Sequence, residues 1–336
     1  LAWFAGVVGR HDGGLVDSED RKLVGPQRSV VGEVQSCSGS FPFLDGSLCG
    51  AASVFVHGHY AYVAAAEVDS LTVVDLYRPS QPTIVGTVQD RVRLRQATAV
   101  WVTDEYVVVV SRGSFPDCDG YLALVDVRDE RWYQDYAGRW LVSPRIFSST
   151  RDCKRSDDPT FPRLYGSLCG ATAVAVHETR TAYVLAQEVH TLTVVLMPPA
   201  LGSGGISIRG SVRDERLDHA HSLALEHPFV YVASRWCATR CLVKVGVSNP
   251  QNPQIAEVIA TADYPQRVHG LQFLSRGGTE ELPYHRLIAE PIGGRVVVVD
   301  AQCTDAVVQN GMEISLCTRE ESRQIYREDV GIGELP

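Results

Sequence analysis

The stretch AASVFVHGHYAYVAAAEVDSLTVVDLYRPSQPTIVG, residues 51–86, holds four short apolar runs separated by turn-forming residues. The runs are rich in Val, Tyr and Thr, whereas Gly, Asp and Pro lie between them. β-branched and aromatic residues favour strands, and Gly, Pro and Asp favour turns. Because four strands within about 40 residues are typical of one propeller blade, this stretch predicts a four-stranded sheet.

The same pattern recurs along the whole chain, with clear copies at 173–195 and 222–255, further copies at 99–126 and 270–300, and a partial copy at 2–34. The recurrence predicts an all-β fold that forms a single domain over residues 1–336. The expected architecture is a β-propeller of six four-stranded blades, with seven as the alternative count. The predicted blades cover residues 1–36, 46–92, 94–150, 166–213, 217–262 and 267–320.

The partial copy at 2–34 lacks the first strand of the pattern, which bears on how the ring of blades closes. An open ring would expose strand edges, and such edges favour aggregation. We therefore expect a C-terminal strand, at 313–316 or 324–326, to complete the N-terminal blade.

Several of these units resemble the LVIVD-repeat family of β-propellers. The resemblance implies a propeller fold and, frequently, a surface or extracytoplasmic setting. It implies no particular chemistry, because a fold does not fix a function. The residues that carry it are 61–64, 71–75, Pro79 and Pro82 in the first unit, and 230–232 and 249–253 in a later one.

Composition excludes some classes of partner. The net charge of −9 gives no attraction to phosphate backbones, so we expect no nucleic-acid partner. No apolar stretch reaches the roughly 18 residues of a membrane span, so we expect none.

The nine cysteines follow a second level of repetition. Cys37 and Cys153 are each followed by Phe-Pro and then by Gly-Ser-Leu-Cys-Gly-Ala, which contains Cys49 or Cys169. The order indicates duplication of a two-blade unit with a period of about 120 residues. Disulfides across such connections predict an oxidising setting: extracellular, cell surface, periplasm or lumen. Buried free thiols are the alternative. The predicted pairs are Cys37–Cys49, Cys153–Cys169, Cys237–Cys241 and Cys303–Cys317, with Cys118 left over.

Histidines offer one candidate metal site. His221 and His269 occupy matching places at the start of first strands, which line the central channel of a propeller, and His219 is close to His221. Neutral imidazole is a common metal ligand, so these three histidines form a hypothetical axial site. The alternative is that they are polar because water fills the channel, and then no cofactor is expected.

Acidic residues give weaker signals. Residues 117–120, Asp-Cys-Asp-Gly, start like a calcium loop, but the distal Glu is missing and the sequence is also ordinary turn chemistry. Asp75, Asp126 and Asp300 each end a third strand and are interpreted as acceptors of turn N–H bonds. No nucleophile elbow, phosphate-binding glycine loop or zinc-protease motif is present, and we predict no catalytic residue.

The segment 127–165 is an insertion rich in aromatic and Arg residues. Such side chains are the usual anchors of protein interfaces, and insertions in repeat folds lie on faces where partners bind. A long fourth strand with a covering loop is the alternative. The candidate partner-binding residues are Arg131, Trp132, Tyr133, Tyr136, Trp140 and Phe147.

These observations predict a non-enzymatic, extracytoplasmic propeller that binds a protein partner or takes part in a structural assembly. Two alternatives remain open. One is a metalloenzyme with the axial histidine site, and the other is a carbohydrate-binding module in which the insertion's aromatic rings stack on a glycan.

Overall fold

A computed structural model of the protein describes most of the chain between residues 32 and 315. The described ranges are 32–38, 46–113, 119–128, 131–155, 164–200, 204–234, 241–260, 268–275, 285–291, 297–300, 306–309 and 312–315.

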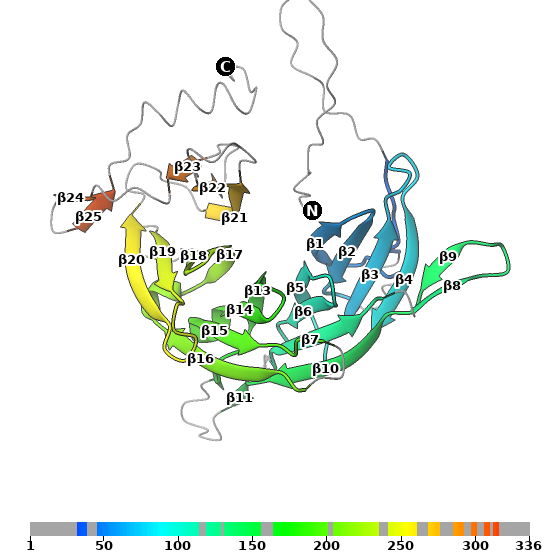
Figure 1. Ribbon diagram of the computed structural model, residues 1–336, viewed down its shortest axis with the longest axis horizontal. Coiled ribbons are helices and arrows are strands. Elements are labelled where there is room, and N and C mark those ends of the chain that lie inside the picture. Colours follow the sequence, from blue (N-terminus) through cyan, green and yellow to red (C-terminus); the bar gives the residue numbers. More distant parts are fainter. Residues whose placement is uncertain are drawn as a thin grey trace, which may run out of the picture.

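Four complete four-stranded antiparallel sheets follow one another along the chain (Figure 1). The first sheet is β1 (Ala51–His57), β2 (Tyr60–Ala65), β3 (Ser70–Asp75) and β4 (Thr83–Gln89). The second is β5 (Ala97–Val102), β6 (Val107–Ser111), β7 (Tyr121–Asp126) and β10 (Arg145–Arg151). The third is β13 (Ala171–His177), β14 (Thr181–Ala186), β15 (Thr191–Leu196) and β16 (Ser207–Arg213). The fourth is β17 (Ala220–Glu226), β18 (Phe229–Ser234), β19 (Cys241–Gly246) and β20 (Gln254–Ala260).

Smaller elements complete the described fold. A three-stranded sheet follows the fourth one and contains β21 (Val268–Ser275), β22 (His285–Pro291) and β23 (Val297–Asp300). The two-stranded pairs are β8 (Trp132–Gln134) with β9 (Trp140–Val142), β11 (Lys154–Arg155) with β12 (Leu164–Tyr165), and β24 (Ala306–Gln309) with β25 (Met312–Ser315). Short 3-10 turns, η2 (Gln187–Val189) and η3 (Glu215–Leu217), lie in connections. No helix in the described ranges is long and apolar enough to span a membrane.

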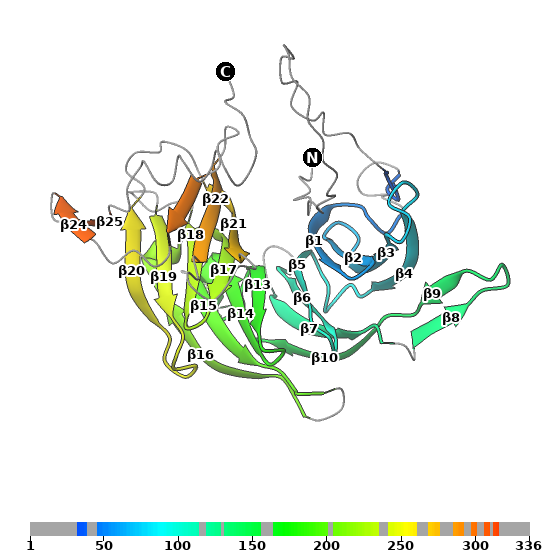
Figure 2. The ribbon, with the colours of Figure 1, turned by 45° about the horizontal axis from the view of Figure 1, so that its top comes forward.

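The sheets fan around a common centre, as Figures 1 and 2 show. In each complete sheet the first strand is innermost and the fourth is outermost. The innermost strands β1, β5, β13, β17 and β21 contact one another in that order. The prediction of an all-β fold of repeated four-stranded sheets is therefore confirmed.

The core lies between successive sheets. Val107–Val110 of β6 are fully buried, because a central strand in a stack of sheets packs on both of its faces. One apolar cluster joins the first and second sheets, another joins the second and third, and a further one joins the third and fourth. Each of the four complete sheets is therefore held against its neighbour by an apolar cluster, which fixes their arrangement around the centre.

A glycine on the outermost strand lets each of two sheets receive the next one. Gly86 in β4 pairs with Val73, and Gly210 in β16 pairs with Val194, each beside a register shift. A Cβ on Gly86 would overlap the carbonyl oxygen of Val142, and one on Gly210 would lie 2.6 Å from that of Gln251. In both cases the connection between the third and fourth strands of the next sheet occupies this space.

Disulfides close two equivalent connections. Cys37–Cys49 and Cys153–Cys169 are both formed, and Cys49, Cys153 and Cys169 are buried. These two predicted pairs are thus confirmed. Of the other cysteines, Cys118, Cys237, Cys303 and Cys317 lie outside the described residues, and the side chain of Cys241 is not described.

The hydrogen bonds around the two disulfides repeat as well. Thr72 Oγ1 donates to the Ser47 carbonyl at 2.7 Å, and Thr193 Oγ1 donates to the Ser167 carbonyl at 2.5 Å. Each hydroxyl belongs to the third strand of the sheet that its connection enters. The two copies predicted from the sequence therefore also share their disulfide and this hydrogen bond in the structure.

The contact at Gly86 gives a stability prediction. Gly86→Ala places a methyl group against the Val142 backbone, so the free energy of unfolding should fall by about 1–3 kcal/mol. Gly205→Ala is the matched control, because a Cβ there meets nothing within 4 Å. Urea denaturation of both variants measures the difference, and equal stability of the two would contradict the close approach.

Candidate functional site: an aromatic hairpin

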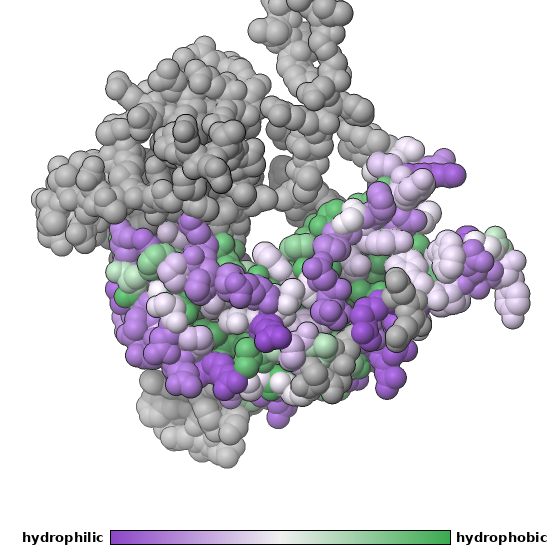
Figure 3. Space-filling view, viewed as in Figure 1, coloured by the Kyte–Doolittle hydropathy of each residue, from purple (hydrophilic) through white to green (hydrophobic). Residues whose placement is uncertain are grey.

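The predicted insertion contains a hairpin that projects from the rim of the molecule. Strands β8 and β9 follow β7 and precede β10 in the chain. They pair antiparallel, with Trp132 opposite Val142 and Gln134 opposite Trp140. In the space-filling view of Figure 3 the hairpin stands clear of the body. We call residues 131–143 the aromatic hairpin. The rest of the segment 127–165 contributes β10 to the second sheet and the short pair β11–β12.

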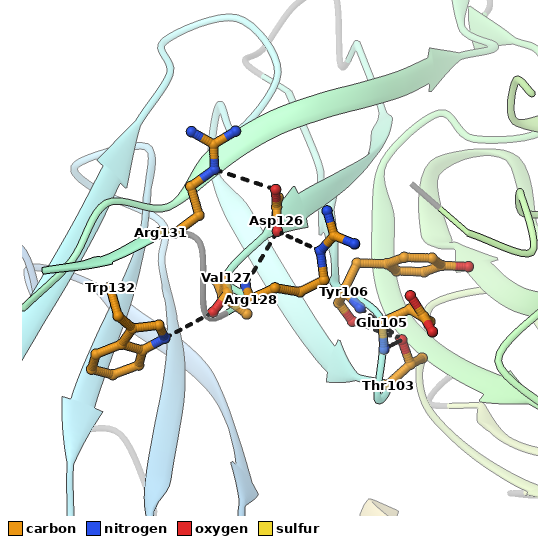
Figure 4. Close-up of polar contacts among 8 residues, drawn as sticks. All are labelled: Thr103, Glu105, Tyr106, Asp126, Val127, Arg128, Arg131 and Trp132. Atoms are coloured by element: carbon orange, nitrogen blue, oxygen red, sulfur yellow. Dashed lines mark hydrogen bonds and ion pairs between the residues drawn. The ribbon is translucent and has the colours of Figure 1, made fainter. Parts of the chain in front are cut away.

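A buried carboxylate holds the base of the hairpin (Figure 4). Asp126 ends β7 and is 4% exposed. It accepts hydrogen bonds from Nε of Arg128 at 3.1 Å and from Nε of Arg131 at 3.3 Å. Burial pushes the pKa of Asp126 upward, but hydrogen bonds from Arg128 and Arg131 outweigh it, so the pKa lies below its ordinary value. The ionised carboxylate thus ties both ends of the turn that leads into β8.

Trp132 anchors the hairpin to the first sheet. Its Nε1–H donates to the Val127 carbonyl at 3.0 Å, and its ring lies 4.8 Å from that of Tyr60, between ring centroids. On the other strand Val142 is buried against Gly86. Both strands therefore begin from fixed positions.

The tip of the hairpin is a tight polar turn. Asp135 Oδ1 accepts the backbone N–H groups of Ala137 and Arg139, both at 2.9 Å, and its Oδ2 accepts Arg139 Nε at 2.7 Å. Gly138 has a positive φ of 74°, a conformation that favours glycine. The hydrogen bonds from Arg139, first the backbone one, lower the pKa of Asp135. The turn is ordered by its own side chains.

Three aromatic side chains on this frame face solvent. Tyr133 is 49% exposed, Trp140 is 59% exposed, and Tyr136 at the turn is fully exposed. Exposed Tyr and Trp on a preformed element give contact area at low cost in conformational entropy, which suits recognition of a partner.

The six predicted partner-binding residues thus divide into three groups. Arg131 and Trp132 fix the base, whereas Tyr133, Tyr136 and Trp140 are presented to solvent. Phe147 lies in β10 rather than on the hairpin, and its ring is 5.8 Å from that of Tyr106 between centroids. Phe147 packs between the second and third sheets.

Sequence reasoning missed a small polar pocket beside the hairpin base. It has a volume of about 170 Å³ and lies between the first and second sheets. The residues with ionisable side chains that line it include His57, Asp104, Glu105 and Arg128. They come from turns of two sheets, so no local sequence signal connects them.

The axial histidines lie in another part of the molecule. His219 Nδ1 is 3.0 Å from Gln187 Nε2, and His221 Nδ1 is 3.4 Å from the His219 carbonyl. His269 lies in β21, but its side chain is not described. Among the side chains that the structure describes, no group of three His, Cys, Asp or Glu residues is arranged to hold a metal ion. The three-histidine site stays a prediction.

The aspartates at the ends of third strands behave as turn acceptors where they are described. Asp75 Oδ1 accepts the Tyr77 N–H at 2.8 Å, and Asp126 Oδ1 accepts the Arg128 N–H at 3.2 Å. The side chain of Asp300 is not described, and residues 117 and 118 of the candidate calcium loop lie outside the described ranges.

Comparison with known proteins identifies the repeat. Residues 50–90 match the LVIVD repeat, which forms β-propeller blades. No curated protein matches the chain.

Solved structures show distant likeness. The chain is similar to a protein from Lactobacillus plantarum (15% identity, 79% of this chain and 72% of the other, TM-score 0.46). It is also similar to a Bacteroides fragilis protein whose description as a 6-phosphogluconolactonase is provisional (9%, 76% and 73%, TM-score 0.48). A Bacteroides caccae protein of unknown function is a third (10%, 74% and 77%, TM-score 0.44). These likenesses are too low to assign an activity.

The Asp126 anchor gives a pH-dependent prediction. Because its pKa is lowered by folding, Asp126 stabilises the fold above the unfolded value of about 3.9, and this contribution is lost as the pH falls through the lower folded pKa. Asp126→Asn removes the charge that both arginines share. Since these arginines are about one-third exposed, we expect a loss of about 1–3 kcal/mol at neutral pH.

Urea denaturation at neutral and acidic pH measures this loss. The difference between Asp126→Asn and the unmodified protein should shrink as the pH is lowered below about 3.9. Asp135→Asn, at the exposed tip, is the control and should have a smaller effect. A pH-independent difference for Asp126→Asn would contradict the assigned role of its charge.

Proposed function

We propose that this LVIVD-repeat protein is a six-bladed β-propeller, closed by strands from its two ends, that binds a protein partner through the aromatic hairpin. It acts without catalysis, as an interaction or assembly module outside the reducing cytosol. The observation that carries the proposal is the exposure of Tyr133, Tyr136 and Trp140 on a hairpin whose base is fixed in the fold.

The hairpin adds little to the core between the sheets. At its base the partly buried Trp132 and the buried Val142 pack on the cluster between the first and second sheets, whereas Tyr133, Tyr136 and Trp140 beyond the base are exposed. Contact with another molecule explains why an element that contributes little to the core projects into solvent. Aromatic rings could also stack on sugars, but the ring contact described at the hairpin, Trp132 with Tyr60, is tilted by 44° rather than flat.

The contact pattern at the N-terminal end supports six blades. A Cβ on Gly32 would overlap the Pro79 carbonyl, just as one on Gly86 would overlap that of Val142. Residues 32–38 therefore occupy, against the first sheet, the place that β4 occupies against the second. The proposed count of six adds one blade before the first sheet to the four complete sheets and the β21–β23 sheet.

The two disulfides support the proposed compartment, because such bonds persist in oxidising surroundings. In protein isolated from its source without reductant, Cys37, Cys49, Cys153 and Cys169 should resist alkylation. Replacing both Cys153 and Cys169 by Ser should cost about 3 kcal/mol in the chain-entropy model. Mass spectrometry after alkylation measures the first effect, and full labelling of these four cysteines would place the protein in a reducing compartment.

Site-specific photo-crosslinking tests the proposed interface. A photoreactive amino acid at position 136, introduced into the full chain in its native host, should give a discrete protein adduct. The same amino acid at position 77 is the matched control, because Tyr77 is 71% exposed in the connection between β3 and β4, outside the hairpin.

A second change makes the crosslinking result specific. Trp140→Ala should reduce the adduct at position 136 by at least about tenfold, as expected for a hot-spot side chain, without lowering the melting temperature. Equal adducts at positions 77 and 136, or an adduct indifferent to Trp140→Ala, would refute binding through the hairpin.

A further inference from the structure

The junction between the third and fourth sheets contains an open cavity of about 320 Å³. Its walls are Thr181, Val194, Leu196 and Arg209 of the third sheet and the connection 249–251 of the fourth. Val194 is buried, whereas Arg209 and residues 249–251 are exposed, so the cavity opens on the rim.

The register of the strands identifies the equivalent place two sheets earlier, in the junction between the first and second sheets. Thr181 pairs with His177 as Tyr60 pairs with His57, and Val194 pairs with Gly210 as Val73 pairs with Gly86. Thr181 and Val194 therefore correspond to Tyr60 and Val73. Likewise the connection 249–251, which covers Gly210, corresponds to Val142, which covers Gly86.

In that earlier junction an indole occupies the corresponding place. Trp132 lies on the Tyr60 ring and packs against the apolar cluster that contains Val73. The connection of the fourth sheet has no tryptophan, and Thr181 is much smaller than Tyr60. The cavity is thus the vacant counterpart of the site that Trp132 occupies.

The walls suit an aromatic side chain from outside. A cavity of ~150 Å³ is enough to bind benzene in another protein, so this one has room for a larger ring system. The Arg209 guanidinium can stack on an aromatic face, and the side-chain amide of Asn249 or Gln251 can accept an indole N–H.

The chain itself presents such a group. Trp140 is 59% exposed on the aromatic hairpin, and the side chains around it on the hairpin are already fixed to one another. Hairpin and cavity belong to different parts of the rim, beside β4 and beside β16 respectively (Figure 1). Since both strands of the hairpin are anchored at its base, the contact must join two copies.

We propose that the cavity at Thr181, Leu196 and Arg209 receives Trp140 of a second copy of this chain. The inference rests on the proposed function and names its partner. A hairpin that enters a cavity elsewhere on the next copy makes a heterologous, head-to-tail contact, which propagates to a ring or a filament.

Sedimentation of the purified full chain over a range of concentrations tests the proposal. The unmodified protein should self-associate, and Trp140→Ala should weaken association by at least about tenfold. Thr181→Tyr, which introduces the residue that the first sheet carries at this place, should block the cavity and have the same effect. Tyr77→Ala is the control and should associate normally.

Mixing the two variants gives the sharpest outcome. Trp140→Ala keeps its cavity and Thr181→Tyr keeps its hairpin, so the mixture should form one-to-one dimers that grow no further. A chain that stays monomeric at every concentration, association unaffected by Trp140→Ala, or a mixture without dimers would each overturn the proposal. Monomers whose hairpin still gives the crosslinked adduct would leave the proposed function standing and remove only the second copy as its partner.

Discussion

The fold depends on the close approach between the outermost strand of one sheet and the connection that leads to the outermost strand of the next. A glycine makes this approach feasible at Gly86 and Gly210, and Gly32 makes a like approach to Pro79, because any Cβ at these positions would overlap a backbone carbonyl. The facing connection differs in each case: a proline turn at Pro79, the hairpin residue Val142, and the turn at Pro250 and Gln251. The constraint concerns only backbone atoms, so the connection is free to vary in sequence and length. At the corresponding positions of the second and fourth sheets Ser148 and Glu257 replace the glycine, and Glu257 pairs with Lys244 at 3.4 Å.

This freedom explains where the aromatic hairpin arises. In the first and fourth sheets the third and fourth strands are joined by short turns, whereas in the second sheet the same connection is extended into β8 and β9. Val142 keeps the contact that the turn would make, and Asp126 with Arg128 and Arg131 holds the entry. The sheets are thus preserved while a rigid, aromatic element is added at the rim. Such an element gains affinity because its conformation is fixed before it binds.

The sequence predicted the repeated sheets and the first two disulfides correctly because both depend on local patterns. Apolar runs between turn residues define strands, and the repeated Gly-Ser-Leu-Cys-Gly-Ala motif defines equivalent cysteines. The fourth strand of the first sheet begins at Thr83, directly after Pro79 and Pro82. The aromatic content of the insertion was visible, but its hairpin was not, since strands of three residues carry no periodicity. The partners of Asp126, the polar pocket and the match between Thr181 and Tyr60 depend on register and on contacts between sheets, which no local pattern encodes.

The central claim is that the hairpin serves recognition and not folding. The most direct measurement replaces residues 133–141 by a short turn, which keeps Arg128, Arg131, Trp132 and Val142 at the base, and compares unfolding and self-association of the two proteins. The account predicts a folded, disulfide-bonded protein that still unfolds in one cooperative transition. This protein should no longer associate or crosslink to a partner. A variant that fails to fold, or one that folds and still associates, would contradict it.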